Sequence, residues 1–285
     1  MPNLIDIRRR IKSTKNTAQI TKAMKMVSAS RLRRASERAQ EARPYAERLF
    51  DVHRSLLARV QDFDGNLYQL KQGKTLLVVV AGDKGLCGPF NASILKRAEA
   101  LFRENGHDKY VVMPVGRKSV TYFANHKVDV VEGYEHIFRN VTMGIAEDIG
   151  EALVTAFSGE GIGKVVILFN KFRNVLVQEV TEWQVLPLVE EDSDEAAASE
   201  GAEHLAEPSL EEILNDLSPR VITTRVFQAL LESCASEHAA RMTAMDSATN
   251  NARDMIDRLT LVMNKARQAA ITTELIEVVS GAAAL

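Results

Sequence analysis

Residues 220–280 read RVITTRVFQALLESCASEHAARMTAMDSATNNARDMIDRLTLVMNKARQAAITTELIEVVS and contain neither glycine nor proline. A run of this kind predicts one long helix, and Gly281 follows it where a C-cap glycine would stand. Small and apolar residues recur along it at alternating spacings of three and four, which is typical of a coiled-coil seam. The expected seam is His238, Arg241, Met245, Ala248, Ala252, Met255, Leu259, Val262, Ala266, Ala269, Thr273, Ile276 and Ser280.

Two start signals precede this helix. Ser209 and Glu212 form a capping box that predicts a short helix, and Ser218-Pro219 is a second start with proline at the first helical position. We therefore expect a C-terminal helical region over 209–285. The stretch before it, 190–208, is acidic and low in complexity, which predicts a solvated, poorly ordered loop.

The other end of the chain carries a similar signal. Residues 3–64 contain no glycine and one proline, Pro44, which should kink the helix or mark an irregularity in it. Asn3 followed by Asp6 predicts an N-cap, so we expect an N-terminal coiled-coil helix over 1–64. Its seam is expected at Leu4, Ile7, Ile11, Ala18, Met24 and Val27, and then at Leu32, Ala35, Ala39, Ala42, Ala46, Leu49, His53, Leu56 and Val60.

Helices of this length would reach roughly 80 and 90 Å. A narrow apolar stripe cannot stabilise either one alone, so we expect the two to pair antiparallel into one coiled coil. An isolated pair with an alanine-rich seam exposes apolar surface. The pattern thus indicates that a further partner wraps around it.

The middle of the chain alternates strand and helix signals. Strands are expected at 75–81, 109–115, 128–131, 164–172 and 178–188, and helices at 89–104, 117–124 and 142–157. This order predicts a Rossmann-like α/β domain over 74–189, inserted between the two long helices. The fold class is therefore α/β, with a long antiparallel two-helix coiled coil made by the ends of the chain.

Composition narrows the function. The 285 residues include two cysteines, Cys87 and Cys234, too few for a disulfide scaffold or a multi-cysteine metal site. We find no apolar run of membrane-spanning length and no signal-peptide pattern at the N-terminus. Residues 1–60 hold 15 lysines and arginines against five acidic residues, whereas residues 190–212 hold ten acidic residues and no basic one. The two ends should therefore meet different partners.

No active site emerges from the motifs. The turn Gly82-Asp83-Lys84-Gly85-Leu86-Cys87-Gly88 stands where a phosphate-binding loop would, but it fits neither nucleotide-binding glycine pattern, which favours a simple strand-to-helix turn. Cys87 has no candidate base and is expected to be buried. The histidines have no metal-ligand spacing, and His53 and His238 lie on the seams. A nucleotide-binding enzyme remains an alternative, for which ATP or NAD should raise the thermal stability; we expect no such effect.

The strongest polar signal is a basic cluster on the N-terminal helix. It comprises Arg8, Arg9, Arg10, Lys12, Lys15, Lys22, Lys25, Arg31, Arg33 and Arg34. It could be a solvated helical face, a nucleic-acid-binding surface, or a helix pair gripped by an acidic protein collar. Steeply salt-dependent binding to DNA would favour a nucleic-acid-binding coiled-coil protein. The absence of interleaved aromatic residues argues against that alternative.

Three stretches resemble the γ subunit of bacterial F-type ATP synthases. The first is RRIKSTKNTAQITKAMKMVSASRLRRA over 9–35, with Asn16-Thr17 and 20–24 at its heart. The second is 83–88 with Phe90-Asn91, and the third is NKARQAAITTELIEVVSGA over 264–282. The cysteine pair of the chloroplast form is absent, so the resemblance implies no thiol switch.

The resemblance implies a central rotor shaft that couples transmembrane proton flow to the conformational cycle of catalytic β subunits. It implies as partners three α and three β subunits, the ε subunit and the membrane ring of c subunits, with no nucleic acid, no cofactor and no catalysis by the chain itself. The expected location is the cytoplasmic side of the bacterial inner membrane, as a peripheral protein. Met24, Arg267, Gln268 and Thr272 match rotor–stator positions, to which charge and place add Arg9, Lys22 and Lys25. His204 and Glu207 match the foot at the c ring.

Overall fold

The computed structural model describes residues 4–60, 65–126, 128–188, 207 and 209–283. It divides into two compact units, which are described separately: unit 1 is residues 1–29 with 241–285, and unit 2 is residues 30–240. The helices are α1 (Leu4–Leu57), α2 (Phe90–Asn105), α3 (Arg117–Phe123), α4 (Met143–Ser158) and α5 (Leu210–Ala283), with short 3-10 turns at His107–Lys109 and Ile137–Arg139. The strands are β1 (Lys74–Val80), β2 (Tyr110–Val115), β3 (Asp129–Val130), β4 (Ile162–Phe172) and β5 (Gln178–Leu186).

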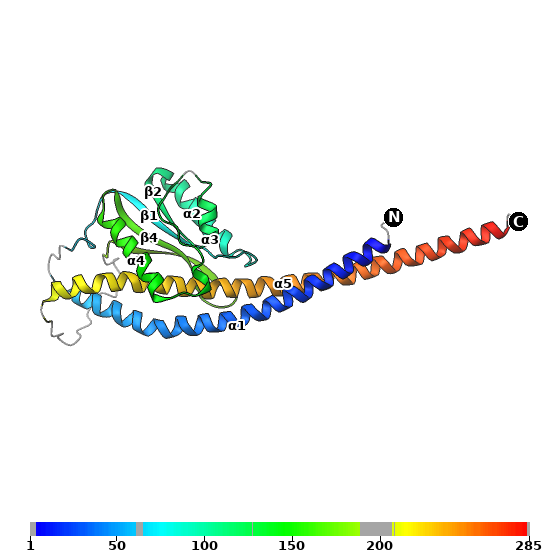
Figure 1. Cartoon of the computed structure of the whole chain (residues 1–285), viewed down its shortest axis with the longest axis horizontal. Coiled ribbons are helices and arrows are strands. Elements are labelled where there is room, and N and C mark those ends of the chain that lie inside the picture. Colours follow the sequence, from blue (N-terminus) through cyan, green and yellow to red (C-terminus); the bar gives the residue numbers. More distant parts are fainter. Residues whose placement is uncertain (1–3, 61–64, 127, 189–206, 208, 284–285) are drawn as a thin grey trace. The chain divides into compact units, whose positions relative to one another are not determined.

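Unit 2 is built on one five-stranded sheet in the order β3-β2-β1-β4-β5 (Figure 1). Its first four strands are parallel, and β5 pairs antiparallel with β4. In the register, Leu76 of β1 lies between Val111 of β2 and Val165 of β4. The strands and helices predicted from the middle of the sequence are therefore confirmed, with ends that differ by three residues or fewer.

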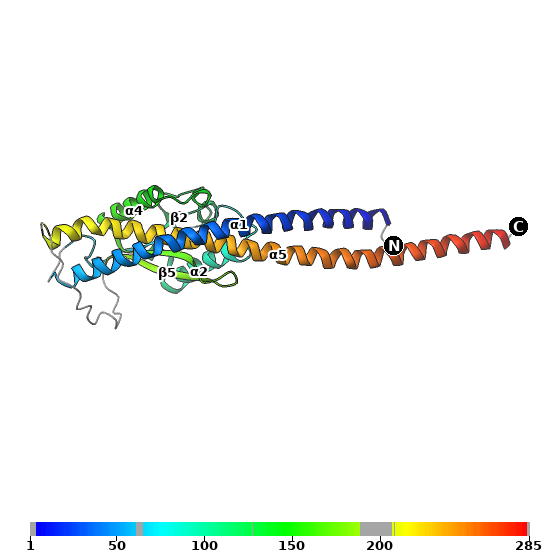
Figure 2. The same ribbon diagram turned by 90° about the horizontal axis from the view of Figure 1, so that it is seen from below.

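The sheet has a buried core on both faces. Leu77 and Val79 of β1 pack on one face against Ile94 and Phe102 of α2 and Phe123 of α3. Their alternate neighbours, such as Val78, point to the other face and are also fully buried. Helix α4 lies on that second face, opposite α2 (Figures 1 and 2). A strand buried on both faces explains why TLLVVVA reads as a continuous apolar run.

Helix α1 is shorter than the sequence predicts. It ends at Leu57, and the amides of Arg59 and Val60 turn to the carbonyls of Leu56 and Leu57, which tightens the chain out of the helix. The helix continues through Pro44. Asn3, the expected N-cap, and residues 61–64 lie outside the described residues.

Helix α5 differs from expectation at both ends. Ser209 caps the helix as expected, since the amide of Glu212 donates to Ser209 Oγ at 3.2 Å. The second start at Ser218-Pro219 is wrong, because one helix runs through Pro219. Proline there costs one backbone donor, and the helix continues because Val221 and Ile222 beyond it are fully buried. Gly281 does not end the helix either, since α5 runs on to Ala283. The acidic loop 190–208 lies, except for Glu207, outside the described residues.

Helices α1 and α5 lie side by side and antiparallel within each unit (Figures 1 and 2). In unit 2, Arg43 Nη2 is 2.9 Å from Glu232 Oε1, and in unit 1, Lys25 Nζ is 2.7 Å from Asp246 Oδ1. The predicted pairing of the two ends of the chain is therefore confirmed.

Candidate functional site: the helix pair of unit 1

The α1 seam of unit 1 keeps a strict three–four spacing, although this register buries polar residues. Its buried and half-buried positions include Leu4, Ile7, Ile11, Thr14, Ala18, Thr21, Lys25 and Ser28. The sequence analysis placed Val27 in this seam, which is wrong, because Val27 is 53% exposed. Met24 is half-buried beside it. A helix pair preserves its packing period, so the seam accepts polar residues when they come at the right spacing.

The seam of α5 also differs by one residue, at some positions, from the seam that the apolar pattern predicts. The buried and half-buried positions with regular spacing are Met245, Thr249, Ala252, Ile256, Leu259, Met263, Ala266 and Ala270. Met255 and Val262, which the apolar pattern assigned to the seam, are 55% and 46% exposed. The sequence thus predicts Met245, Ala252, Leu259 and Ala266 correctly, whereas Met255 and Val262 each lie one residue before the half-buried positions Ile256 and Met263.

Polar contacts bridge the two helices inside unit 1. The hydroxyl oxygens of Thr21 and Thr249 are 2.8 Å apart, and Thr249 Oγ1 also lies 2.7 Å from the carbonyl oxygen of Met245. One turn away, Lys25 donates to Asp246 at 2.7 Å, with both side chains close to half exposed. An ion pair so exposed contributes at most about 1 kcal/mol. It does, however, compensate part of the charge of Lys25 within the chain.

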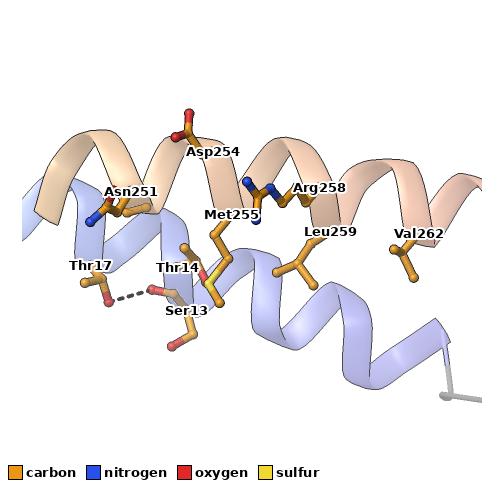
Figure 3. Close-up of a pocket in the computed structure, with 10 residues that line it drawn as sticks. Ser13, Thr14, Thr17, Asn251, Asp254, Met255, Arg258, Leu259 and Val262 are labelled. Carbon is orange, nitrogen blue, oxygen red and sulfur yellow. Dashed lines mark hydrogen bonds between the residues drawn. The ribbon is translucent and has the colours of Figure 1, made fainter. Parts of the chain in front are cut away.

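A groove that the sequence did not predict runs over this helix pair, with a volume of about 620 Å³. Its lining combines hydroxyl, charged and apolar side chains: Ser13, Thr14, Thr17, Asn251, Ala252, Asp254, Met255, Arg258, Leu259 and Val262 (Figure 3). Thr14 Oγ1 meets Met255 Sδ at 3.9 Å across it. The exposed Met255 and Val262 therefore line a groove rather than the seam.

The seven predicted contact residues all lie in unit 1, on two helices. Arg9 and Lys22 are exposed on α1, and Met24 and Lys25 are half-buried. Arg267, Gln268 and Thr272 are exposed on α5, where Thr272 Oγ1 donates to the carbonyl oxygen of Gln268 at 2.9 Å. Among the described contacts, Lys25 alone of these seven forms an interhelical ion pair.

No residue of α1 that the structure describes lies beside the last turns of α5. The antiparallel contact of Thr14 with Met255 sets Leu4, the first described residue of α1, level with about residue 265, because both helices rise equally per residue. Every residue from 271 to 280 is exposed. This apolar tip of α5 presents Ile271, Leu275, Ile276, Val278 and Val279.

The turn after β1 has a structural role in unit 2. The Asp83 carboxylate accepts hydrogen bonds from the amides of Arg117, His136 and Phe138 at 2.9–3.0 Å. Asn91 Oδ1 accepts from the amide of Gly82 at 2.8 Å, and Asn91 Nδ2 lies 3.1 Å from Cys87 Sγ. Cys87 is buried and unbridged. These contacts support the interpretation of residues 82–88 as a strand-to-helix turn.

Other predicted residues are placed only in part. His53 is buried in the seam of unit 2, and desolvation, assisted by the positive charge of Arg225, lowers the pKa of His53 to about 4. His204 lies outside the described residues, and Glu207 is exposed. Within the described part of the chain, no group of His, Cys, Asp and Glu could hold a metal ion, and no helix is both long and apolar enough to cross a membrane.

Comparison with known proteins agrees with this arrangement. Residues 3–285 match the model of the ATP synthase family. The chain is 46% identical over 288 residues to the ATP synthase gamma chain of Geotalea uraniireducens, with 99% of this chain and 98% of that protein covered. It is 47% identical over 286 residues to the corresponding protein of Geobacter metallireducens, with the same coverage.

Solved structures are similar as well. A chain of the central stalk and c-ring structure of Tetrahymena thermophila mitochondrial ATP synthase is 27% identical and has a TM-score of 0.63, over 80% of this chain and 99% of that one. A chain of Euglena gracilis mitochondrial ATP synthase, at 18% identity and a TM-score of 0.70 over 99% and 94%, shares the fold. The helix pair, the inserted α/β domain and the nearly full-length sequence match all lead to one assignment: this chain belongs to the ATP synthase gamma chain family.

Proposed function

We propose that this chain is the central rotor shaft of an F-type ATP synthase, which couples transmembrane proton flow to the conformational cycle of the catalytic β subunits. The observation that carries the proposal is the helix pair of unit 1, whose α5 ends in an exposed apolar tip. Exposed apolar surface of this extent on a helix pair indicates a partner. Family membership over nearly the whole chain supports the identity of that partner.

The proposed mechanism rests on asymmetry. Three β subunits of one sequence differ in conformation only when something contacts them differently. The helix pair presents the exposed Lys22 on α1, the exposed Asp254 on α5 and apolar residues at its tip, so each β subunit would meet different chemistry. Each contact favours one β conformation by its differential affinity, and rotation exchanges these preferences. The chain transmits work mechanically and has no catalytic role of its own.

The proposed partners are three α and three β subunits around unit 1, with the ε subunit and the ring of c subunits at the foot. We assign the rotor–stator contact to Arg9, Lys22, Met24, Lys25, Arg267, Gln268 and Thr272, and the foot contact to His204 and Glu207. Among the cations, Lys22 is exposed whereas Lys25 is paired with Asp246. Lys22 is therefore the stronger candidate for an acidic loop of β. The complex would hold the chain on the cytoplasmic side of the inner membrane.

Co-expression with the α and β subunits of the same source tests the proposal. We expect one copy of the chain to join a six-subunit ring and to raise its ATPase activity strongly. Leu275→Asp in the tip should weaken this association because it places a charge in a surface to be covered. Leu70→Asp is the matched control, since Leu70 is 83% exposed but lies in unit 2. Failure of the folded native chain to join the ring would refute the proposal.

The basic cluster of α1 supports a second candidate, a nucleic-acid-binding coiled coil. Arg8, Arg9 and Arg10 are exposed on consecutive positions, so their charge is accessible to a polyanion. Steeply salt-dependent retention of the chain on DNA, together with no association with the ring, would favour this candidate. The candidate would be rejected if the chain assembled with the ring and its retention on DNA were already lost at moderate salt.

A further inference from the structure

The α/β domain has the topology of a ligand-binding sheet. Its strand order β3-β2-β1-β4-β5 reverses direction between β1 and β4, which are neighbours. In open α/β sheets, ligands bind at such a switch point, outside the carboxyl ends of the strands. Here that place lies beyond Val80 of β1 and Phe172 of β4.

At the end of β4, this place is occupied by α5. Ser236 Oγ donates to the carbonyl oxygen of Asn170 at 2.9 Å, and the amide of Phe172 donates to Glu232 Oε2 at 3.0 Å. The side chain of Asn170 continues the contact, because its Nδ2 donates to the carbonyl oxygen of Phe90 at the start of α2. Helix α5 is thus hydrogen-bonded to the carboxyl end of β4.

At the end of β1, the contact is steric. A Cβ atom placed on Gly82 would lie 3.1 Å from the carboxyl carbon of Glu237 and 3.2 Å from Asn91 Oδ1. The glycine therefore leaves the space that the Glu237 carboxyl group occupies. One turn along α5, Ala240 packs into a buried cluster with Cys87 and Phe90. Phe90, the first residue of α2, is thus covered by the chain itself, at the end of the helix where a ligand phosphate would sit.

Helix α5 buries two carboxylates against the α/β domain, and removing each of them from water costs free energy. Glu232 and Glu237 are each 3% exposed. Glu232 is compensated by Arg43 of α1 at 2.9 Å as well as by the Phe172 amide. Apolar side chains of similar volume would often give equal or greater stability at such positions. Directional hydrogen bonds, unlike apolar contacts, define how far the helix is rotated and shifted.

We propose that α5 is the resident occupant of the switch-point crevice, and that Glu232 and Glu237 are positioning residues that fix its register against the α/β domain. The crevice is consequently closed to nucleotides. If the chain is the rotor proposed above, this edge is where the domain and the shaft helix are locked to turn together. The inference itself concerns the isolated chain and is tested there.

A double-mutant cycle tests the contact at β1. Gly82→Ala should lower the thermal midpoint of the otherwise native chain, because the new methyl group displaces the Glu237 carboxyl group. In the Glu237→Ala background the same change should have a smaller effect, because the Glu237 carboxyl group is gone and only Asn91 Oδ1 remains close to the new methyl group. Equal shifts in both backgrounds would overturn this half of the proposal. Gly144→Ala is the control, since nothing lies within 4 Å of a Cβ there.

The positioning role needs a readout that stability alone does not move. Spin labels at the exposed positions Arg220 of α5 and Lys84 beyond β1 should give one narrow distance distribution in the native chain. The Glu232→Met/Glu237→Met variant keeps the bulk of both side chains but loses their hydrogen-bonding groups. In this variant the distance distribution should broaden, or shift as the helix moves by up to one turn, about 5.4 Å. Glu211→Met/Glu212→Met, exposed on the same helix, should leave it narrow.

Hydrogen exchange gives an independent measure. Exchange at the Phe172 amide should rise about tenfold in Glu232→Met, which removes its acceptor, and far less in Glu232→Gln, which retains one. A narrow, unshifted distance distribution and native protection of Phe172 in the Glu232→Met/Glu237→Met variant would overturn the proposal. These experiments need no partner subunit, so their failure and failure of the rotor function are distinguishable.

Discussion

Thr21 and Thr249 meet inside the helix pair of unit 1, with their hydroxyl oxygens 2.8 Å apart and both residues buried. Each hydroxyl also has a backbone carbonyl of its own helix within reach, Ala18 for Thr21 and Met245 for Thr249. The pair is therefore satisfied without water. It places a directional contact in a seam where alanine and other small residues provide little apolar area.

We expect Thr249→Val to lower the free energy of unfolding by about 1 kcal/mol, the usual cost of losing one buried hydrogen bond at constant shape. The matched control is Thr273→Val on the same helix. Thr273 makes the same kind of bond to the carbonyl four residues earlier, but it is exposed. Its replacement should change stability by less than about 0.5 kcal/mol. Urea unfolding of the three chains measures both, and equal values would show that the Thr21–Thr249 contact contributes nothing.

Gly116→Ala should be severely destabilising. The residue has φ +90, and a Cβ atom on it would lie 1.8 Å from the carbonyl oxygen of Ala81. Relief requires β1 and β2 to separate where they are hydrogen-bonded, so we expect a loss of more than about 3 kcal/mol. Gly144→Ala, within α4, should instead stabilise the chain by up to about 1 kcal/mol through helix propensity. Thermal unfolding of both variants checks the contrast in sign.

Stability should depend on pH through His53. The ring nitrogen Nε2 lies 2.6 Å from the Tyr68 hydroxyl, which in turn lies 2.7 Å from Ser218 Oγ. Burial lowers the pKa of His53 from 6.5 to about 4, so between these values the unfolded chain binds more protons than the folded chain. The contribution of neutral His53 to the free energy of unfolding is fully present above pH 6.5. It is lost as the pH falls to about 4, and the loss is at most about 3 kcal/mol.

The variant His53→Asn isolates this contribution. Its free energy of unfolding should fall less steeply than that of the native chain between pH 6.5 and 4. His136→Asn provides the control, because His136 is exposed and its φ of 62 suits asparagine. Parallel curves for His53→Asn and the native chain would contradict the depressed pKa of His53.

The end of α5 should be dispensable for folding. Residues 281–285 follow a stretch of α5, 271–280, in which every side chain is exposed. Removing them therefore shortens the helix only at its exposed end. No buried contact of the described chain depends on that stretch, so the unfolding midpoint should change by less than about 2 °C. We expect the truncated chain still to assemble with its partner subunits. Loss of the assembled complex would show that the last five residues belong to the contact surface.

The sequence predicted the α/β domain well because its signals are local. A run such as TLLVVVA is buried on both faces, and each strand is separated from the next by turn residues, so neither depends on distant parts of the chain. Val27, Met255 and Val262 were misplaced for the opposite reason. Their exposure is decided by which side of α1 faces α5, a property of the pair.

Two further differences have the same origin. Pro219 stands within a helix because buried residues such as Val221 follow it, which no local start signal can register. Lys25 resembles a free surface cation in the sequence, yet Asp246, 221 positions away, pairs with it. The groove over Thr14 and Met255 likewise exists only once two distant helices are aligned.

Met24→Lys should impair the coupling of proton flow to ATP synthesis in the assembled complex. Met24 is half-buried on α1, one residue from Lys25 and two from the exposed Lys22, so the variant adds a third cation to one turn. Beside acidic loops of β, the added charge would strengthen one rotary position over the others, and the extra barrier would slow rotation under load. ATP hydrolysis should persist while coupled synthesis falls. Met26→Lys is the control, because Met26 is 61% exposed on the same helix and, two residues after Met24, faces away from it. Coupled synthesis in Met24→Lys equal to that of the native complex would remove Met24 from the proposed contact.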